Sequence, residues 1–378
     1  MKKYISRIII IVLLGGILVW MIVAKDRKFS EQENRYLSQF PKLTKETVLS
    51  GEFMNNFETY LADQFPARDI CVRLKTSMLR LSGQRLINDI FVGDDNYLIQ
   101  KLSDYDKDNL EGTIECVNTF SNNLTDVSVD FMIVPTAESI YEDKLPYTAE
   151  SSEKELIDDI CVQFNDNINC IQVFDAIESE KNIGMYYKTD HHWTTNAAYA
   201  AFEEFAKEKE LDTENVEYVF YPVTGSFQGT CASGSGIYNT YDTIEICVPE
   251  NSEGTYVVNY VEEQKKTASL FDSSKLEEKD KYQVFMGGNF SQVDIKTSAD
   301  SGRNLLVIKD SYANSFIPML TPYYDRITVI DPRYFAGNIY EVIDDNNINE
   351  VLFLYNINSF ITDNSLEVVL DNLLKQAE

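Results

Sequence analysis

The sequence predicts an α/β fold in which helices flank both faces of a parallel sheet. Four short stretches are apolar almost throughout, as strands buried on both faces are, at residues 127–134, 304–308, 327–330 and 351–355. Segments with the 3.6-residue apolar period of helices accompany them, at residues 151–164, 195–209 and 365–375. Strands that alternate with helices in this way are typical of parallel sheets.

The chain before the first of these strands differs in character. Residues 26–50 are polar and are expected to form an extended stem. Residues 53–81 have a helical apolar period that Pro66 interrupts. Residues 90–99, with Gly93 and an Asp-Asp-Asn run in the middle, predict a hairpin-like entry to the main domain.

Two further segments complete the prediction. Residues 170–174 predict a strand, and residues 216–300 have the Thr, Tyr, Gly and Ser content of a β-rich insertion. The expected organisation is then a cytoplasmic tail and anchor over residues 1–25, a stem and helical segment over 26–90, and a main domain over 91–378 with the insertion at 216–300.

The N-terminus predicts a transmembrane helix. Lys2, Lys3 and Arg7 precede an uninterrupted apolar run of seventeen residues, 8–24. At about 1.5 Å per residue this run comes close to spanning a bilayer core. The basic flank predicts a single-pass protein whose C-terminal domain is extracytoplasmic. A cleaved signal peptide, giving a secreted protein, is the alternative, although the run is long for one.

Charge and cysteine content exclude some classes of protein. With 61 acidic and 33 basic residues the net charge is −28, which argues against a nucleic-acid partner. None of the six cysteines forms a C-x-x-C pair, so a zinc or thioredoxin-like site is not expected. An exported protein could pair some of them. Cys161 and Cys170 are the closest in sequence, but the sequence leaves the pairing open. We predict no cofactor and no metal.

The two histidines of the chain, His191 and His192, are adjacent. Imidazole exchanges protons near neutral pH, and Asp190 could orient it. Ser311 follows a predicted strand at a turn into a helix, where ligands of α/β sheets bind. The three residue types needed for a Ser-His-Asp arrangement are therefore Ser311, His192 and Asp190. Taken singly, each has a structural interpretation: Ser311 or Asp190 as a helix cap, the histidines as a structural pair and Trp193 as packing.

Two runs of sequence carry a resemblance to a known family. Residues 189–202, TDHHWTTNAAYAAF, and residues 307–316, VIKDSYANSF, resemble the bacterial DHHW proteins. These are similar to the SGNH-hydrolase-like domains of alginate O-acetyltransferases. The resemblance covers most of the chain from about residue 29 and includes the runs Glu33-Asn34-Arg35, Asp63-Gln64-Phe65-Pro66-Ala67-Arg68, Val92-Gly93 and Asp331-Pro332-Arg333.

The resemblance implies an SGNH-like domain with circularly permuted blocks and a set of site residues. Ser311 matches the nucleophile, and Asp190 and His192 match the Asp-x-His pair. By their order in the chain, Gly337 and Asn356 (or Asn358) could supply the oxyanion hole. Trp193 and Arg333 are the substrate-binding candidates. Lys309 departs from the pattern because ordinary SGNH enzymes have glycine there.

The function expected from these residues is that of a membrane-anchored O-acetyltransferase or acetylesterase. Its partner would be a cell-surface polysaccharide or another acylated glycan, with a membrane acyl-transfer protein as a further possible partner. The alternative is an inactive SGNH-like ectodomain that binds surface glycan or a partner protein. The run 189–192 also resembles that of metal-dependent DHH phosphoesterases, but the further histidine ligands of a two-metal site are absent from this sequence.

Overall fold

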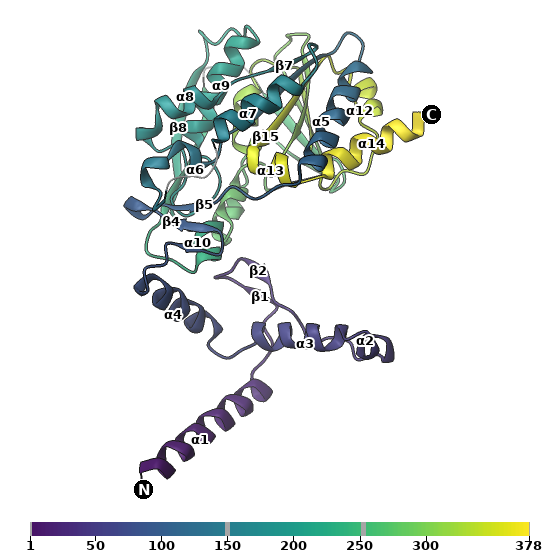
Figure 1. Ribbon diagram of the computed structural model, residues 1–378. Helices are drawn as coiled ribbons and strands as arrows, with labels where there is room; N and C mark the ends of the chain where they lie inside the picture. Colours follow the sequence, from purple (N-terminus) through teal and green to yellow (C-terminus); the bar gives the residue numbers. More distant parts are fainter. Residues whose placement is uncertain (1, 148–151, 251–254, 378) are drawn as a thin grey trace. The chain divides into compact units, whose positions relative to one another are not determined.

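The computed structural model describes residues 2–147, 152–250 and 255–377. The chain divides into two compact units (Figure 1). The first comprises Met1–Asn88 and Ala232–Tyr238, and the second comprises Asp89–Cys231 and Asn239–Glu378. A short piece of the predicted β-rich insertion therefore belongs to the same unit as the predicted stem.

The second unit is built on one eight-stranded sheet, with the strand order β11-β10-β12-β14-β13-β15-β6-β7. The strands from β14 to β7 run parallel to their neighbours. Every residue of β15 is buried, as expected for a strand covered on both faces. The expected α/β class with a mostly parallel sheet is confirmed. The parallel strands are β6 (Ser128–Val134), β7 (Ile168–Cys170), β13 (Asn304–Lys309), β14 (Arg326–Ile330) and β15 (Glu350–Asn356).

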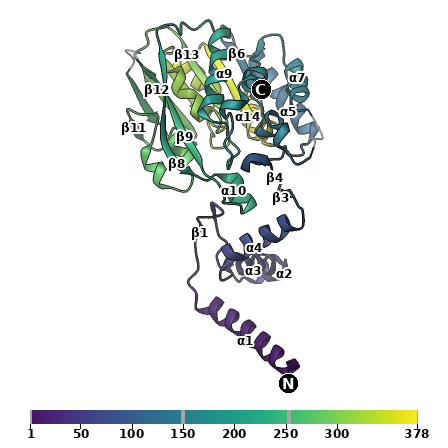
Figure 2. The same cartoon turned by 90° about the vertical axis from the view of Figure 1, so that its left-hand side faces the viewer.

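Helices lie on both sides of this sheet (Figures 1 and 2). On one side the ring of Phe120, from α5, contacts Phe353 of β15, which stacks on Phe131 of β6. Near the other side of the sheet α9 packs on α8 and α11. The helices are α5 (Lys107–Asn122), α6 (Ala137–Ile140), α7 (Glu153–Gln163), α8 (Phe174–Ser179), α9 (Thr195–Glu208), α11 (Ala313–Phe316), α12 (Ile339–Asn346), α13 (Ile357–Thr362) and α14 (Ser365–Ala377).

The predicted β-rich insertion is only partly separate from the main sheet. Strands β8 (Glu217–Phe227) and β9 (Asp242–Glu250) form their own antiparallel pair. Strands β10 (Tyr256–Tyr260), β11 (Lys265–Thr267) and β12 (Gln292–Thr297) instead extend the main sheet, because β12 pairs antiparallel with β14. The segment between β8 and β9 contains α10 (Thr230–Ser235).

Other differences from the sequence prediction are local. The strand predicted at 170–174 ends at Cys170, and α8 begins at Phe174. Helix α5 was not predicted. The predicted start of the helix at residues 151–164 lies outside the described residues. The hairpin expected at residues 90–99 is formed by β4 (Ile90–Val92) and β5 (Leu98–Gln100). Short 3-10 helices lie at Asp94–Asn96, Glu142–Lys144, Lys181–Ile183, Ser273–Glu277, Lys281–Val284 and Ile317–Leu320.

The first unit contains the helices predicted at 53–81, broken near Pro66 as expected. The predicted stem is not simply extended, since it contains a small hairpin and a short helix. An ion-pair network joins these parts: Arg35 pairs with Asp63, and Arg68 pairs with Glu33. The elements are α1 (Lys2–Val23), β1 (Phe29–Ser30), β2 (Arg35–Tyr36), α2 (Lys45–Leu49), α3 (Glu52–Asp63), α4 (Arg68–Leu81) and β3 (Leu86–Ile87).

The expected membrane anchor over residues 8–24 falls within α1. Several side chains of this stretch lie outside the described residues. Among the residues that are described, no helix combines the length and the apolar character needed to cross a membrane. The predicted transmembrane helix is therefore not supported by the structure.

One disulfide joins Cys161, near the end of α7, to Cys170 at the end of β7. The Cα atoms of the pair are 5.9 Å apart, a usual separation for a disulfide. The closest pair in the sequence is thus the bonded one. Cys71, Cys116, Cys231 and Cys247 are free thiols.

Candidate active site

Ser311 lies in the turn that follows β13 and precedes α11. The buried carboxylate of Asp310 holds this turn. It accepts hydrogen bonds from the backbone N–H of Tyr312 and from that of Asn356, both at 2.9 Å. Since Asn356 ends β15, Asp310 ties the serine turn to the end of the neighbouring strand. Burial raises the pKa of Asp310, which these hydrogen bonds partly offset.

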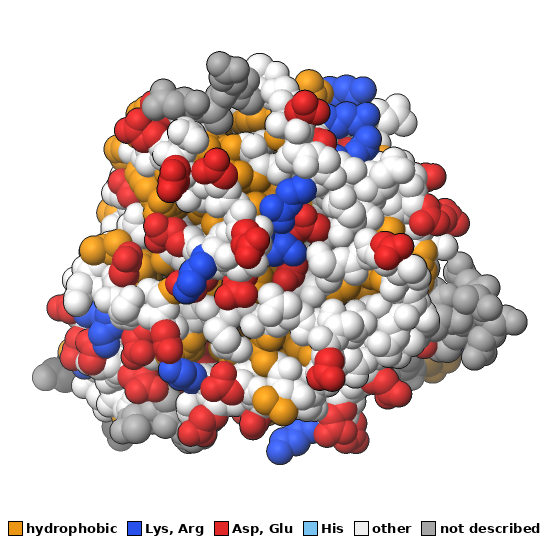
Figure 3. Space-filling model, turned by 90° about the horizontal axis from the view of Figure 1, so that it is seen from above, with side chains coloured by type: hydrophobic (Ala, Val, Ile, Leu, Met, Phe, Trp, Pro, Cys, Tyr) orange, Lys and Arg blue, Asp and Glu red, His pale blue; other side chains and the backbone are white. Residues whose placement is uncertain are grey.

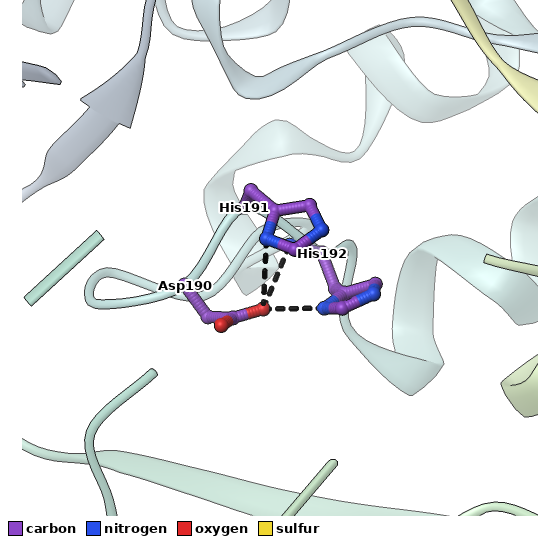
Figure 4. Close-up of side chains that lie close together, drawn as sticks. All are labelled: Asp190, His191 and His192. Carbon is purple, nitrogen blue, oxygen red and sulfur yellow. Dashed lines mark hydrogen bonds and ion pairs between the residues drawn. The ribbon is translucent and has the colours of Figure 1, made fainter. Parts of the chain in front are cut away.

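The structure brings the three predicted residues Ser311, His192 and Asp190 together. The Nε2 atom of His192 is 2.8 Å from Ser311 Oγ. Its Nδ1 atom is 2.5 Å from Asp190 Oδ1, as the close-up in Figure 4 shows. Each imidazole nitrogen therefore has one partner, in the order serine, histidine, carboxylate. A Ser-His-Asp arrangement that activates a serine has this connectivity.

Asp190 is 2% exposed, and hydrogen bonds serve both of its oxygens. Oδ1 also accepts from the backbone N–H of His192 at 3.0 Å. Oδ2 accepts from the backbone N–H of Thr230 at 2.7 Å and from its hydroxyl at 3.0 Å. Burial by itself would raise the pKa of Asp190, but the two imidazoles and these donors hold it well below its usual range. The carboxylate is therefore ionised and fixed in orientation.

Gly229 allows this close approach. A Cβ atom built on Gly229 would lie 2.0 Å from Asp190 Oδ2 and 2.3 Å from Asp190 Cβ. No side chain fits there without moving the carboxylate. The adjacent N–H of Gly229 donates to Thr189 Oγ1 at 3.2 Å. The backbone of residues 229–230 thus cradles the residues on both sides of Asp190 Cα.

Asp242, the first residue of β9, supports the same loop. Its carboxylate accepts from the backbone N–H groups of Lys188 and Thr189, both at 2.8 Å, and from the Thr189 hydroxyl at 2.5 Å. The run before His192 is therefore held by residues from both ends of the connection between β8 and β9.

Two rings pack against His192. The ring of Tyr282 stacks on it, with centroids 3.8 Å apart and an interplanar angle of 10°. The ring of His191 lies 3.9 Å away at 36° (Figure 4). His191 Nδ1 is 2.6 Å from Thr230 Oγ1. Burial and the adjacent His192 lower the pKa of His191 to about 4, against the opposing effect of Asp190. His191 is therefore neutral near pH 7.

Trp193 does not face a substrate, which corrects its assignment as a binding candidate. Its side chain is fully buried. Its Nε1–H donates to the carbonyl of Tyr312 and to Ser315 Oγ, both at 3.0 Å. The ring thereby ties the histidine run to the segment after Ser311.

The oxyanion candidates differ in their surroundings. Asn356 is buried, and its Oδ1 caps α13 by accepting from the N–H groups of Asn358 and Ser359. Its Nδ2 has no hydrogen-bond partner among the described residues. The Oδ1 of Asn358 accepts from the N–H of Ser103 instead. Gly337 is exposed between β14 and α12, and the ring of Phe335 packs close to its Cα. Asn356 is thus the candidate with a free donor.

Lys309 and Arg333 share one carboxylate, that of Asp331. The buried Lys309 Nζ lies 3.2 Å from Asp331 Oδ2 and 2.8 Å from the side-chain oxygen of Asn289. Arg333 makes a two-pronged contact with the Asp331 carboxylate, at 2.8 and 2.6 Å. The Arg333 side chain remains 30% exposed. Its positive charge also helps to lower the pKa of His191. Of the two substrate-binding candidates, Arg333 is the one that solvent reaches.

The same cluster was considered as a metal site. One potential ligand atom from each of Asp190, His191 and His192 lies within 4.8 Å of the others. In the structure, however, both Nδ1 atoms are engaged, one with Thr230 and the other with Asp190. A metal ion would have to replace these hydrogen bonds. The arrangement suits proton transfer better than coordination.

Comparison with known proteins places the chain in a family. The model of a family described as DHHW protein matches residues 83–330. This chain belongs to the DHHW family. The resemblance inferred from the two sequence runs is thereby confirmed. No curated protein matches the sequence.

Solved structures share the fold of this DHHW protein. A DHHW family protein from Eubacterium siraeum DSM 15702 is 26% identical, with a TM-score of 0.63 over 75% of this chain and 95% of that one. PatB1 of Bacillus cereus, in a structure with a sulfonyl adduct, is 19% identical, with a TM-score of 0.62 over 73% and 97%. The O-acetyltransferase domain of Pseudomonas putida AlgJ is 14% identical, with a TM-score of 0.46 over 75% and 98%.

The contact between Gly229 and Asp190 generates a first prediction. Gly229→Ala should destabilise the folded protein by about 1–3 kcal/mol, because the new methyl group overlaps a well-packed carboxylate. Urea unfolding measures the change. Gly225→Ala is the matched control, since its Cβ would meet only Thr243 Oγ1, at 3.8 Å. Equal stability of the two variants would contradict the tight packing described here.

The environment of His191 generates a second prediction. With two histidines in the chain, a pH titration followed by NMR should show one imidazole that takes up its proton only near pH 4. An unfolded histidine is protonated below about pH 6.5. Because the folded pKa is the lower one, the contribution of His191 to stability should fall as pH decreases from about 6.5 to about 4. His191→Gln should remove that component. A midpoint for His191 near 6.5 would show that its burial has no such effect.

Proposed function

We propose that this DHHW protein is an acyl-ester enzyme, an O-acetyltransferase or acetylesterase, in which Ser311 is the nucleophile, His192 the general base and Asp190 the residue that orients it. The observation that carries the proposal is the 2.8 Å contact between His192 Nε2 and Ser311 Oγ, made by an imidazole whose other nitrogen meets a buried carboxylate. A serine hydroxyl is a weak nucleophile until such a base accepts its proton.

The reaction would proceed in two halves. His192 Nε2 accepts the Ser311 proton while Oγ forms a bond to the acyl carbonyl carbon. The tetrahedral intermediate then expels the leaving group, which takes the proton from His192. In the second half a sugar hydroxyl or a water gives its proton to His192 and attacks the acyl-enzyme. Breaking of the acyl–Oγ bond, with return of the proton to Oγ, restores Ser311. Asp190 stabilises the imidazolium that forms in each half.

The oxyanion of each intermediate needs hydrogen-bond donors. Asn356 Nδ2 is supported as one of them because it is buried and unpaired, while the rest of the residue is fixed by Asp310 and by the cap of α13. The N–H of Ser311 and that of Gly337 are the other candidates. Preorganised donors of this kind account for about 3 kcal/mol each.

We further propose a cell-surface polysaccharide as the acyl acceptor, from the family resemblance of the sequence. Arg333 and the neighbouring Tyr334, both partly exposed, are the side chains we propose for glycan contact. An extracytoplasmic location is supported by the Cys161–Cys170 disulfide, because such bonds persist in oxidising compartments. Attachment through residues 8–24 and a membrane acyl-transfer partner remain proposals from the sequence.

Intact-mass spectrometry tests the nucleophile. After incubation with p-nitrophenyl acetate, the protein should gain about 42 Da, the mass of one acetyl group, on Ser311. Ser311→Ala and His192→Ala should abolish the adduct, whereas Ser226→Ala, an exposed serine of β8, should keep it.

A sulfonyl fluoride is a second probe for the same serine, since PatB1 has been solved with a sulfonyl adduct. If neither reagent modifies Ser311 in the folded protein, the proposal fails. The alternative of an inactive domain that binds surface glycan or a partner protein is then preferred.

Asn356→Asp tests the oxyanion donor. The substitution keeps an acceptor for the α13 cap and the shape of the side chain, but it removes the amide donor. We expect turnover of p-nitrophenyl acetate to fall by about 10²–10³-fold, which is the usual cost of losing one donor. Unfolding in urea should change little. Unchanged turnover would show that the oxyanion hole lies elsewhere.

A further inference from the structure

Helix α4 of the first unit has an unusual exposed face. Ile70, Leu74, Met78 and Leu81 are 67%, 54%, 59% and 88% exposed. They are spaced by four, four and three residues, so they form one stripe along the helix. The opposite face of α4 carries Val72, Thr76 and Leu79 and is the more buried one.

Basic side chains flank this stripe on both sides. On a helical projection, Arg73 and Arg80 lie along one edge of it and Lys75 along the other. All three residues are exposed. Long basic side chains placed beside an apolar stripe can keep their charges in water while their stems cover apolar surface.

The charge of the surrounding chain is also unusual. Residues 25–88 contain 11 basic and 8 acidic residues, whereas residues 89–378 contain 19 basic and 53 acidic residues. The first unit is thus slightly positive in a protein of net charge −28. Figure 3, which views the other end of the molecule, shows a face on which acidic side chains predominate.

Exposed apolar side chains are concentrated in the same region. Residues 25–88 carry ten large ones, among them Phe40, Leu43 and Met54, whereas the described part of the much longer second unit carries nine. A concentration of this kind marks a surface that is covered by something else in use.

We propose that α4 lies in the interface of an anionic lipid bilayer, with Ile70, Leu74, Met78 and Leu81 inserted at the level of the headgroups and Arg73, Lys75 and Arg80 facing lipid phosphates. A basic amphipathic helix binds such surfaces through buried apolar area together with attraction to anionic lipids. The surface fits a second copy of the chain less well, because pairing two α4 helices would bring like charges together. The inference depends neither on the acyl chemistry of Ser311 nor on residues 8–24 spanning the membrane.

The test uses the full chain with a polarity-sensitive dye on Cys71, an exposed thiol at the edge of the stripe. A Cys116→Ser background removes the other thiol that is not buried. Vesicles that contain phosphatidylglycerol should shift the dye emission to the blue, and vesicles of phosphatidylcholine alone should shift it far less. All samples keep residues 1–24, so any insertion of that run is common to them and the dye reports on α4.

Substitutions separate the two contributions. Leu74→Glu together with Met78→Glu should abolish the shift, and both positions are exposed enough to leave the far-UV circular dichroism unchanged. Replacing Arg73, Lys75 and Arg80 by Gln should weaken the apparent affinity by about fivefold for each charge removed. High salt should weaken binding of the unsubstituted helix in the same direction. Val162→Glu, at a site of α7 that is 85% exposed, is the matched control and should keep the shift.

Three outcomes would overturn the proposal. One is the absence of a shift with anionic vesicles. Another is an equal shift with phosphatidylcholine, which would remove the role of the basic residues. The third is a shift that depends on protein concentration without lipid, which would assign the stripe to an interface between copies of the chain.

Discussion

The site depends on one buried negative charge. Removing a carboxylate from water costs several kcal/mol unless charges and hydrogen bonds replace the solvent. The Asp190 carboxylate is compensated by His192 and by the backbone and hydroxyl of Thr230, and Gly229 leaves the room that this requires. His192 is then oriented through its Nδ1, and its Nε2 is left for Ser311. The geometry of the serine contact therefore follows from how the carboxylate is satisfied.

The parallel sheet supplies the other half of the site. Ser311 follows β13, and Asn356 ends the adjacent parallel strand β15. Asp310 bonds to both the serine turn and the end of β15, so the two neighbouring strand ends act as one rigid edge. The histidine loop meets this edge through Trp193, whose indole N–H reaches the segment after Ser311. Buried hydrogen bonds at two points thus set the distance between base and nucleophile, although 119 residues separate them in the chain.

Much of the architecture could be predicted from the sequence because strands buried on both faces are apolar throughout, as at 351–355. Helix α5 could not be read as easily. Its buried positions, among them Leu110, Ile114 and Val117, do have helical spacing, but Gly112 and several Thr, Ser and Asn residues weaken the local signal. The end of β7 was placed too late because residues 171–174 are apolar for a different reason: they lead into the buried first turn of α8.

The candidate site was predictable where chemistry limits the choice. Two adjacent histidines beside an aspartate left few alternatives for a base, and the serine followed from its strand end. Thr230, Asp242 and Tyr282 could not be found in this way. Each acts through a contact made across the fold, and threonine, aspartate and tyrosine are common on surfaces and in strands. Trp193 was assigned ambiguously because an indole serves equally well in packing and in recognition, and only its burial decides between them.

The connection between β8 and β9 has a mechanical consequence. Thr230, which holds Asp190, precedes Ala232–Tyr238 by two residues, and Asp242, which holds Thr189, follows that segment by four. The segment itself packs within the first unit, where Thr76 and Asn88 donate hydrogen bonds to its backbone carbonyls. A displacement of that segment would therefore pull on both attachments of the Asp190 loop through only a few bonds. For the same reason, this stretch should tolerate changes in its length poorly, despite lying in a connection between strands.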